Sequence, residues 1–290
     1  MQLLKIFCIP ALATLLLIAC KKNDDNVTPS PKGDMYFELP QGNAPYDHQI
    51  VDWYRKYGSY VLYRFPGKEF RYGITGFYYE AVLMRTADTI ALPAAVEFLK
   101  HSWFDFYTDD FLRKYLPFKI LLAGQMLVSE TGLDTTNYPV TYPMAGFDYI
   151  IFPAVDTAFR DMTKEQRRKL KTAVHALFLE ILLYNGNPPK ITPPAAFFEV
   201  SSYDQKQTVS NRYEHGFLVL GYDNNRPIPP SKYRDLMSYI YKIISTPARE
   251  LQATILAPAT DKNGLVGKKY NLLLQFFKTQ YQVDLQAIGE

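Results

Sequence analysis

One residue, a lone histidine on an otherwise apolar segment, has the side chain best suited to chemistry in this sequence. His175 lies in the segment 171–184, where most other side chains are apolar. An imidazole is a common zinc ligand and a common carrier of protons in hydrolysis. The chain has four histidines in all. A metal centre would therefore have few imidazoles to draw on.

The segment around His175 is expected to form a long, mostly buried helix. Apolar residues recur at intervals of three and four, at Leu170, Ala173, Val174, Leu177, Phe178, Ile181 and Leu182. Leu179 extends the apolar surface toward the far side, so more than one face should be covered. Thr163 and Gln166 form a capping-box pair at the start, and the Asn, Gly and Pro residues of 185–189 mark the end.

The same periodicities predict the remaining elements. We expect helices over 48–57, 94–116, from 231 to about 256 with an interruption near Pro247, and 265–281. We expect strands near 60–65, 78–84, 118–124 and 149–152. Residues 185–231 are rich in Asn, Gly and Pro and should be mostly loop. Because no repeat or linker divides residues 36–290, the predicted fold is one helix-dominated α+β domain.

The first twenty residues read as an export signal. One lysine precedes an apolar run that is too short to cross a membrane, which predicts a signal peptide over residues 1–19. The final Leu17-Ile18-Ala19-Cys20 resembles the lipobox of bacterial lipoproteins. This resemblance implies that Cys20 becomes the acylated first residue of the mature chain. The alternative is an ordinary secretory signal whose cleavage site happens to hold a cysteine.

The residues after Cys20 are expected to form a lipid-anchored, disordered tether over 20–35. The stretch lacks a run of apolar residues and is rich in proline and polar groups. Asp24 and Asp25 follow the cysteine closely. They resemble the surface-export signals of outer-membrane lipoproteins in some Gram-negative bacteria, which implies a cell-surface location.

The composition argues against several classes of function. The 32 basic and 29 acidic residues nearly balance, and no basic stripe is present, so a nucleic-acid partner is not expected. Cys8 lies in the leader and only Cys20 remains, so the mature chain has neither a disulfide framework nor a cysteine zinc site. The 23 tyrosines and 19 phenylalanines are expected mainly in core packing. Tyrosine-rich stretches at 72–79 and 138–142 could instead stack a sugar or a peptide.

Four passages, in this order, resemble a family of zinc-binding metallopeptidase-like lipoproteins associated with outer-membrane nutrient import. The passages are residues 51–54, residues 110–122, the helix around His175, and residues 264–285. The resemblance implies a zincin-like fold. Family members carry an HExxH helix and an acidic third zinc ligand on a later helix.

This chain departs from the zincin motif at its most important positions. HExxH places two histidines on one helix face to bind zinc, with the glutamate as general base. Aligned from His175, the base becomes Ala176 and the second ligand becomes Leu179. A shifted alignment over 171–175 keeps only the second histidine. Glu180 cannot substitute, because five residues along a helix is about 140° around its axis.

The later acidic motif is also incomplete. By the resemblance, Asp235 takes the place of the ligand carboxylate, and Lys232 stands where an acid is expected. His175 and Asp235 are then vestigial metal ligands, one fewer than a catalytic zinc site normally uses. His215 could complete a set, although nothing in its spacing requires it. The remaining histidines, at 48 and 101, are interpreted as surface or packing residues.

These observations predict a pseudo-peptidase with no catalytic residue and no cofactor. The expected protein is a surface-exposed outer-membrane lipoprotein, held to the membrane at Cys20, that acts as a binding or accessory component of a nutrient-import system. Outer-membrane import proteins and a peptide or glycan ligand are the expected partners. The alternative is an active zinc metallopeptidase with an unconventional ligand set. A lipoprotein of another function, for which the resemblance misleads, is the third hypothesis.

The lipobox predicts a specific effect of removing its cysteine. Cys20→Ser should leave the chain unprocessed or release it from the membrane fraction, because acyl chains could no longer hold it at a bilayer. Cell fractionation and the mass of the mature chain measure both effects, and Cys8→Ser is the matched control. Normal processing together with unchanged membrane association of Cys20→Ser would contradict the lipoprotein interpretation.

Overall fold

The structure is a computed structural model that describes residues 36–71, 79–130, 137–185, 189–204 and 208–290. The chain divides into two units, Met1–Glu38 and Leu39–Glu290, and the elements below belong to the second. The leader, Cys20 and the predicted tether lie outside the described residues, as does most of the tyrosine-rich stretch 72–79. No helix in the described ranges is long and apolar enough to cross a membrane.

Helices make up much of the second unit. They are α2 (Pro45–Tyr57), α3 (Lys68–Arg71), α4 (Leu92–Ser102), α5 (Asp109–Tyr115), α6 (Thr157–Arg160), α7 (Lys164–Glu180), α8 (Ala195–Glu199), α9 (Lys232–Ser245), α10 (Ala248–Ala253), α11 (Leu265–Tyr281) and α12 (Leu285–Gly289). Short 3-10 turns lie at η1 (Phe104–Phe106) and η3 (Arg212–His215), and a π-helical turn, η2 (Ile181–Asn185), continues α7.

The main sheet is built around one long strand, β3 (Lys119–Glu130). Its first half pairs in parallel with β1 (Tyr60–Leu62) and β6 (Tyr149–Phe152), and its second half pairs antiparallel with β2 (Tyr79–Thr86) and β4 (Asn137–Pro139). The edge strand β5 (Met144–Ala145) is antiparallel to β6. The continuous apolar run at the start of β3 is typical of a parallel strand covered on both faces. A separate hairpin joins β7 (Gly221–Asp223) to β8 (Arg226–Ile228).

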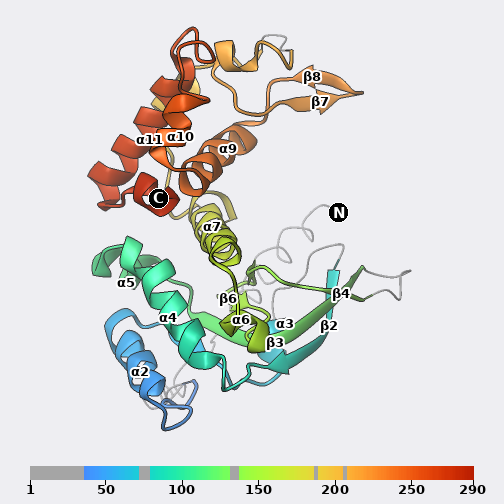
Figure 1. The fold of residues 1–290 in the computed structure, drawn as a ribbon, viewed down its shortest axis with the longest axis vertical. Coiled ribbons are helices and arrows are strands. Elements are labelled where there is room, and N and C mark those ends of the chain that lie inside the picture. Colours follow the sequence, from blue (N-terminus) through green and yellow to red (C-terminus); the bar gives the residue numbers. More distant parts are fainter. Residues whose placement is uncertain (1–35, 72–78, 131–136, 186–188, 205–207) are drawn as a thin grey trace, which may run out of the picture. The chain divides into compact units, whose positions relative to one another are not determined.

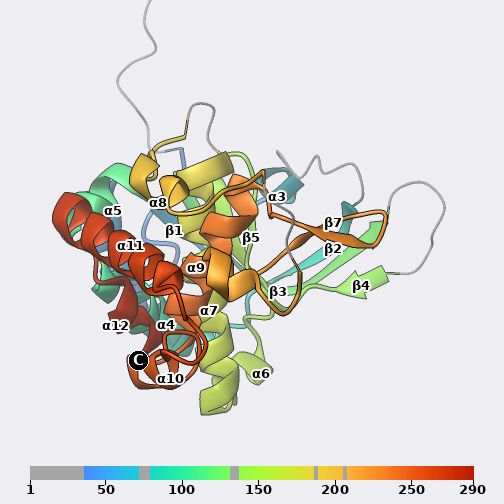
Figure 2. The ribbon, with the colours of Figure 1, turned by 90° about the horizontal axis from the view of Figure 1, so that it is seen from above.

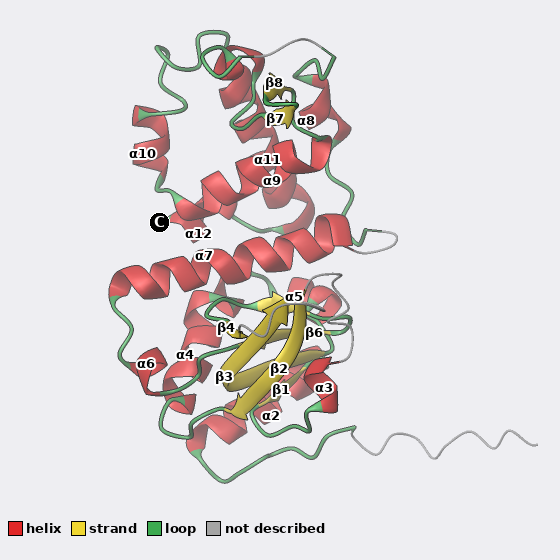
Figure 3. Ribbon diagram, turned by 90° about the vertical axis from the view of Figure 1, so that its right-hand side faces the viewer, coloured by secondary structure: helices red, strands yellow, loops and turns green. Residues whose placement is uncertain are grey.

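Helix α7 lies between two groups of elements (Figure 3). On one side are the main sheet and α4, and on the other are α9 and α12. Helix α11 lies beside α9 and near α8, as the view from above also shows (Figure 2). The side chains of Val174, Phe178 and Leu179 are each almost completely buried. Because the middle of α7 is covered on both sides, a buried polar side chain there must find a partner within the protein.

The predicted start of α7 and the burial of Phe178 and Leu179 are confirmed, whereas the expected burial of Leu177 is wrong. The Thr163 hydroxyl accepts from the backbone N–H of Gln166 at 3.2 Å, and the Gln166 side chain accepts from the Thr163 N–H at 2.8 Å. This reciprocal capping box begins the helix where it was predicted. Leu179 is buried as expected, and Leu177 is only partly buried.

The predicted single helix over 94–116 is wrong. The chain leaves helical geometry at Trp103, makes the turn η1, and begins α5 after Thr108, whose hydroxyl accepts from the Phe111 N–H at 3.3 Å. Two aspartates in the first turn of α5 favour a new helix N-terminus there. The apolar residues recur at helical spacing through both α4 and α5, but the capping residue Thr108 starts a separate helix.

The predicted loop over 185–231 also contains regular structure. It includes α8, η3 and the β7–β8 hairpin (Figure 1). The hairpin turns at Asn224 and Asn225, whose φ angles are 45° and 62°. Asparagine tolerates this left-handed conformation, which two-residue hairpin turns require. These elements are short, so the frequent Asn, Gly and Pro residues between them made the segment look like a loop.

Candidate functional site

His175 is completely buried, and both of its ring nitrogens are hydrogen-bonded. Nε2 lies 2.9 Å from the backbone carbonyl oxygen of Ser102, and Nδ1 lies 2.8 Å from the Tyr107 hydroxyl. A carbonyl can only accept, so Nε2 carries the proton and Tyr107 donates to the lone pair on Nδ1. Ser102 is the last residue of α4, where helix carbonyls lack helical partners. The Nε2–H group of His175 therefore donates to a carbonyl at the end of α4 that has no partner within the helix.

The surroundings of His175 keep the imidazole neutral. Burial lowers its pKa from 6.5 to about 3, an effect that exceeds the opposing hydrogen bond to Ser102. Aromatic rings enclose it: Phe106 meets it edge-on at 5.1 Å and Tyr107 lies at 5.5 Å, centroid to centroid. Burial also raises the pKa of Tyr107 well above its ordinary value. This pair therefore stays uncharged at neutral pH and fixes α7 against α4.

Asp235 is also completely buried, and its partner is a buried lysine. Asp235 Oδ2 accepts from Lys269 Nζ on α11 at 2.6 Å and from the Tyr203 hydroxyl at 2.5 Å. Burial raises the pKa of Asp235 and lowers that of Lys269, while their mutual attraction opposes both shifts. Asp235 Oδ1 is buried without a hydrogen-bond partner among the described residues. Removing either partner would leave a buried charge uncompensated.

Four aromatic rings surround the ammonium group of Lys269. Its distances to the ring centroids are 4.6 Å for Phe217, 4.9 Å for Phe197, 5.6 Å for Tyr203 and 5.7 Å for Tyr239. Ring faces at this range attract a cation, more strongly when water is excluded. The rings and the Asp235 carboxylate together offset the burial of this charge.

The two residues that the resemblance marks as metal ligands are thus used within different hydrogen-bonding groups. His175 bonds to groups at the end of α4 and in the following loop, whereas Asp235 bonds to Tyr203 and α11. His215 makes its 2.7 Å contact with the Ser201 hydroxyl through its backbone carbonyl. Across the described ranges, no three His, Cys, Asp or Glu side chains gather as a metal site would need.

The residues around His175 do not fit a catalytic zinc ion in this arrangement. A zinc ligand needs a free nitrogen lone pair, but the Nδ1 lone pair accepts from Tyr107 and Nε2 carries a proton. Leu179 is buried with apolar neighbours where a second imidazole would be required. Glu180 accepts from Tyr233 on α9 at 2.6 Å. The assignment of His175 and Asp235 as vestigial metal ligands stays a prediction.

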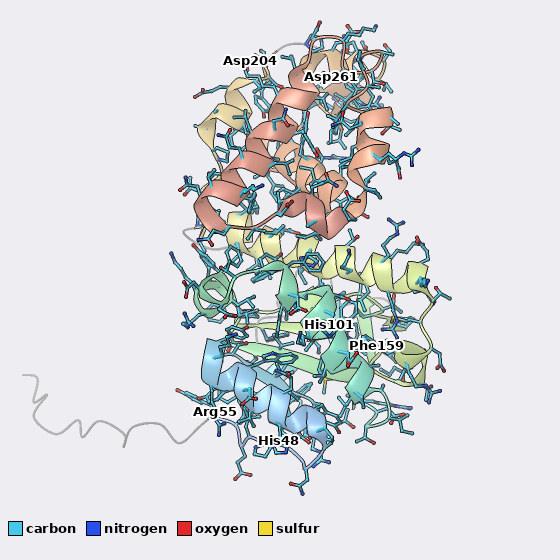
Figure 4. All side chains as sticks on the ribbon, turned by 60° about the vertical axis from the view of Figure 1, so that its left-hand side comes forward. His48, Arg55, His101, Phe159, Asp204 and Asp261 are labelled. Atoms are coloured by element: carbon cyan, nitrogen blue, oxygen red, sulfur yellow. The ribbon has the colours of Figure 1, made fainter. Side chains whose placement is uncertain are left out.

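The other histidines also have ordinary settings. His48 on α2 and His101 on α4 are both exposed (Figure 4). His101 Nδ1 lies 2.8 Å from Asp105 Oδ2. Neither contacts His175 among the interactions that the structure describes.

A cleft of about 490 Å³, which was not predicted from the sequence, opens between α2, η1 and the start of α5. Its wall includes aromatic residues such as Trp53, Phe104 and Tyr107, and its rim carries charged side chains. Tyr107 is one of the lining residues, and its hydroxyl donates to His175 in the interior.

Sequence analysis also missed Lys269. It lies on the buried stripe of α11, between Val266 and Leu273, where a lysine is out of place unless it has a charged partner. A lysine at an apolar helical period is therefore a usable signal for a buried ion pair. The sequence cannot identify the partner, because Asp235 is 34 positions away.

The comparisons with known proteins support the fold. No family model matches the chain, and the search of the curated proteins finds no relative. Among solved structures, a protein from Bacteroides caccae ATCC 43185, described as a "putative zinc-binding metallo-peptidase", has a similar fold, with a TM-score of 0.52 at 16% identity. The match covers 84% of this chain and 88% of that one. The chain therefore has a metallopeptidase-like fold of mixed helices and strands.

The neutral, buried state of His175 predicts a pH dependence of stability. Its folded pKa of about 3 is below that of an unfolded histidine, so only the unfolded chain takes up this proton as the pH falls. The stabilisation is complete above the unfolded value and is lost toward pH 3, by up to about 1.4 kcal/mol per pH unit. His175→Gln should be less stable near neutral pH but should lose less on acidification.

Urea unfolding of both proteins at several values between about pH 4 and pH 7 tests this expectation. His101→Gln, a change to an exposed histidine, is the matched control and should keep the wild-type slope. If His175→Gln and the wild type lost stability equally with falling pH, His175 would not be the buried neutral group described here.

The Lys269–Asp235 pair predicts strong non-additivity. Lys269→Met should lower the free energy of unfolding by about 3–5 kcal/mol, because it leaves the Asp235 carboxylate buried without a counter-charge. Adding Asp235→Asn should recover part of that loss. Lys262→Met, which breaks the exposed 2.7 Å pair with Glu214, should cost less than about 1 kcal/mol. Chemical denaturation of the wild type, Lys269→Met, Asp235→Asn, the double variant and Lys262→Met measures these differences, and additive effects of the two single changes would contradict the coupling.

Proposed function

We propose that this protein is a binding protein without peptidase activity, built on a metallopeptidase-like fold. The observation that carries this proposal is the hydrogen bonding of His175, whose two nitrogens are both engaged within the protein. Zincin chemistry needs a zinc-bound water and a carboxylate that takes its proton. Ala176 stands where that carboxylate would be, and it cannot take a proton. The engaged nitrogens of His175 and the missing carboxylate at position 176 thus both support a protein without peptidase activity.

The later ligand position supports the same conclusion. Asp235 already faces the ammonium of Lys269 at 2.6 Å, in a space enclosed by aromatic rings. A zinc ion at this carboxylate would have to displace that ammonium or lie beside it. The zinc ion and the Lys269 ammonium are both positively charged, and two like charges so close together repel strongly where water is excluded.

The location and partners in the proposal rest on the leader sequence. Acylation at Cys20 would anchor the chain, and the polar stretch 21–35 would hold the folded unit away from the bilayer. Asp24 and Asp25 support display at the cell surface. We propose that the protein works there as a binding or accessory component of an outer-membrane nutrient-import system, with import proteins and a peptide or glycan as partners.

One observation favours a second candidate function. The Bacteroides caccae protein of similar fold is described as zinc-binding, which keeps an active zinc peptidase with an unconventional ligand set as the alternative. That function would require His175 to give up its bond to Tyr107 or to Ser102. It would also require a base other than Ala176.

Peptide cleavage by the purified protein distinguishes the two functions. We expect no turnover of a quenched peptide library, with or without added zinc, because no carboxylate is placed to activate a zinc-bound water. His175→Ala is the matched variant. Turnover that chelation removes and that His175→Ala abolishes would establish the alternative.

Restoring the motif tests the same argument from the other direction. The double variant Ala176→Glu with Leu179→His re-creates the HExxH side chains at 175–179. We expect it to take up more zinc than the wild type without gaining peptidase activity, because the groups that orient metal ligands would still be missing. Full activity in the double variant would show that only these two residues separate the chain from a working peptidase.

A further inference from the structure

Two tyrosines stack on each other at the surface where the end of α7 meets α9. Tyr184, in the π-helical turn η2, and Tyr233, at the start of α9, have ring centroids 4.1 Å apart and an interplanar angle of 31°. Tyr184 is 56% exposed, and a ring covered on both faces could not be exposed to that extent. One face of Tyr184 therefore rests on Tyr233, and the opposite face is open to solvent. A π-helical turn is rare and frequently marks a functional site.

A carboxylate without a counter-charge lies beside this pair of rings. The Tyr233 hydroxyl donates to Glu180 Oε1 at 2.6 Å, and Glu180 is partly buried. Burial and the Glu180 carboxylate both raise the pKa of Tyr233, so its hydroxyl keeps its proton and continues to donate. Among the described residues, no lysine, arginine or histidine forms an ion pair with Glu180. A single hydrogen bond leaves most of the lone pairs of this carboxylate unused.

The position of Glu180 at the end of α7 adds to the need for a cation. Glu180 is the last residue of α7, and the last turn of that helix contains no basic residue. A helix C-terminus carries a partial negative charge, which a cation stabilises and a carboxylate opposes. Lys232 precedes Tyr233 in the chain, but its Nζ lies over the Phe198 ring, 5.7 Å from the centroid. A cation from outside the chain would therefore balance the charge of Glu180.

From the exposed ring and the unpaired carboxylate, we infer that Glu180, Tyr184 and Tyr233 bind the side chain of an arginine in a peptide. The inference deepens the proposed function, on which it rests in taking the chain as a binding protein with a peptide partner, and the site uses neither His175 nor Asp235. A guanidinium is planar and has five N–H donors, so it stacks on a tyrosine face while it donates to a carboxylate. A lysine ammonium, a compact point charge, lacks the flat surface for stacking.

One guanidinium can reach both the ring and the carboxylate, because Tyr233 contacts each of them. Its ring stacks on Tyr184, and its hydroxyl bonds to Glu180. Glu180 and Tyr184 are also four residues apart on one continuous helical segment, a spacing that makes side chains neighbours. The three groups therefore form one patch, and the packing of α7 against α9 assembles it before any ligand binds.

Binding can be measured on the purified full chain by ligand-observed NMR titration in the presence of a chelator. The probes are acetylated, amidated tripeptides with arginine, lysine, citrulline or glutamate between two glycines. Citrulline replaces the guanidinium by an uncharged urea group of nearly the same shape, so it isolates the effect of charge. Maltotriose, an uncharged sugar of similar size, tests a glycan as the ligand of this patch.

We expect saturable binding of the arginine peptide, with an affinity about tenfold higher than that of the citrulline peptide. Glu180→Gln keeps an acceptor for Tyr233 but removes the charge, and it should reduce this preference to about twofold or less. Tyr184→Leu should weaken binding about fivefold, because the stacking surface is lost. The matched controls change an exposed carboxylate of α4, Glu97→Gln, and an exposed tyrosine of α9, Tyr241→Leu, and should leave the affinity within about twofold.

Several results would overturn the inference. They are no saturation by the arginine peptide, equal binding of the citrulline, lysine or glutamate peptide, and an unchanged affinity in either Glu180→Gln or Tyr184→Leu. Binding of maltotriose that equals or exceeds binding of the arginine peptide would assign the patch to a glycan instead.

This experiment separates the ligand class from the lack of peptidase activity. Peptide binding in the presence of chelator does not depend on zinc, and peptide turnover is measured separately. A chain that cleaved peptides would refute the proposed function alone. A chain that neither cleaved peptides nor preferred the arginine peptide would refute the ligand class alone.

Discussion

The burial of α7 on both sides is the constraint on which the rest of the structure depends. A helix between a sheet and a second group of helices leaves no water for a polar side chain in its middle. His175 meets that condition by remaining neutral and by bonding through both nitrogens. The two bonds reach the end of α4 and the residues that lead into α5. Through these two hydrogen bonds, the imidazole of His175 fixes the position of α7 relative to α4 and the residues that follow it.

On the other side of α7, buried polar side chains are stabilised by an ion pair. Asp235 and Lys269 are both completely buried, and each would be strongly unfavourable alone. Their contact, the Tyr203 hydroxyl and four aromatic rings together hold α9 against α11. A fixed ammonium cannot leave, unlike a metal ion. The carboxylate is therefore neutralised whatever ions the surroundings contain.

The sequence predicted those parts of the fold that short-range patterns determine. The capping box at Thr163, the apolar faces of α7 and the strand at the start of β3 were recognisable because each depends on neighbouring residues. The break at Trp103 was missed because one hydrophobic period runs through two helices. The partners of His175 and Asp235 could not be predicted, since Ser102, Tyr107 and Lys269 are 34 to 73 positions away. Likewise, a cleft depends on the packing of helices, which no local pattern encodes.

These contacts show what His175 does in this metallopeptidase-like fold. Once Ala176 and Leu179 occupy the motif positions, a histidine at 175 is useful only if it bonds within the protein, and here it supports Tyr107. Tyr107 in turn lines the cleft beside α2. The imidazole thus links α7 to the end of α4 and to the residue that follows η1. A buried central helix can fix its neighbours in this way whatever chemistry its side chains carry, since one fold can host different functions.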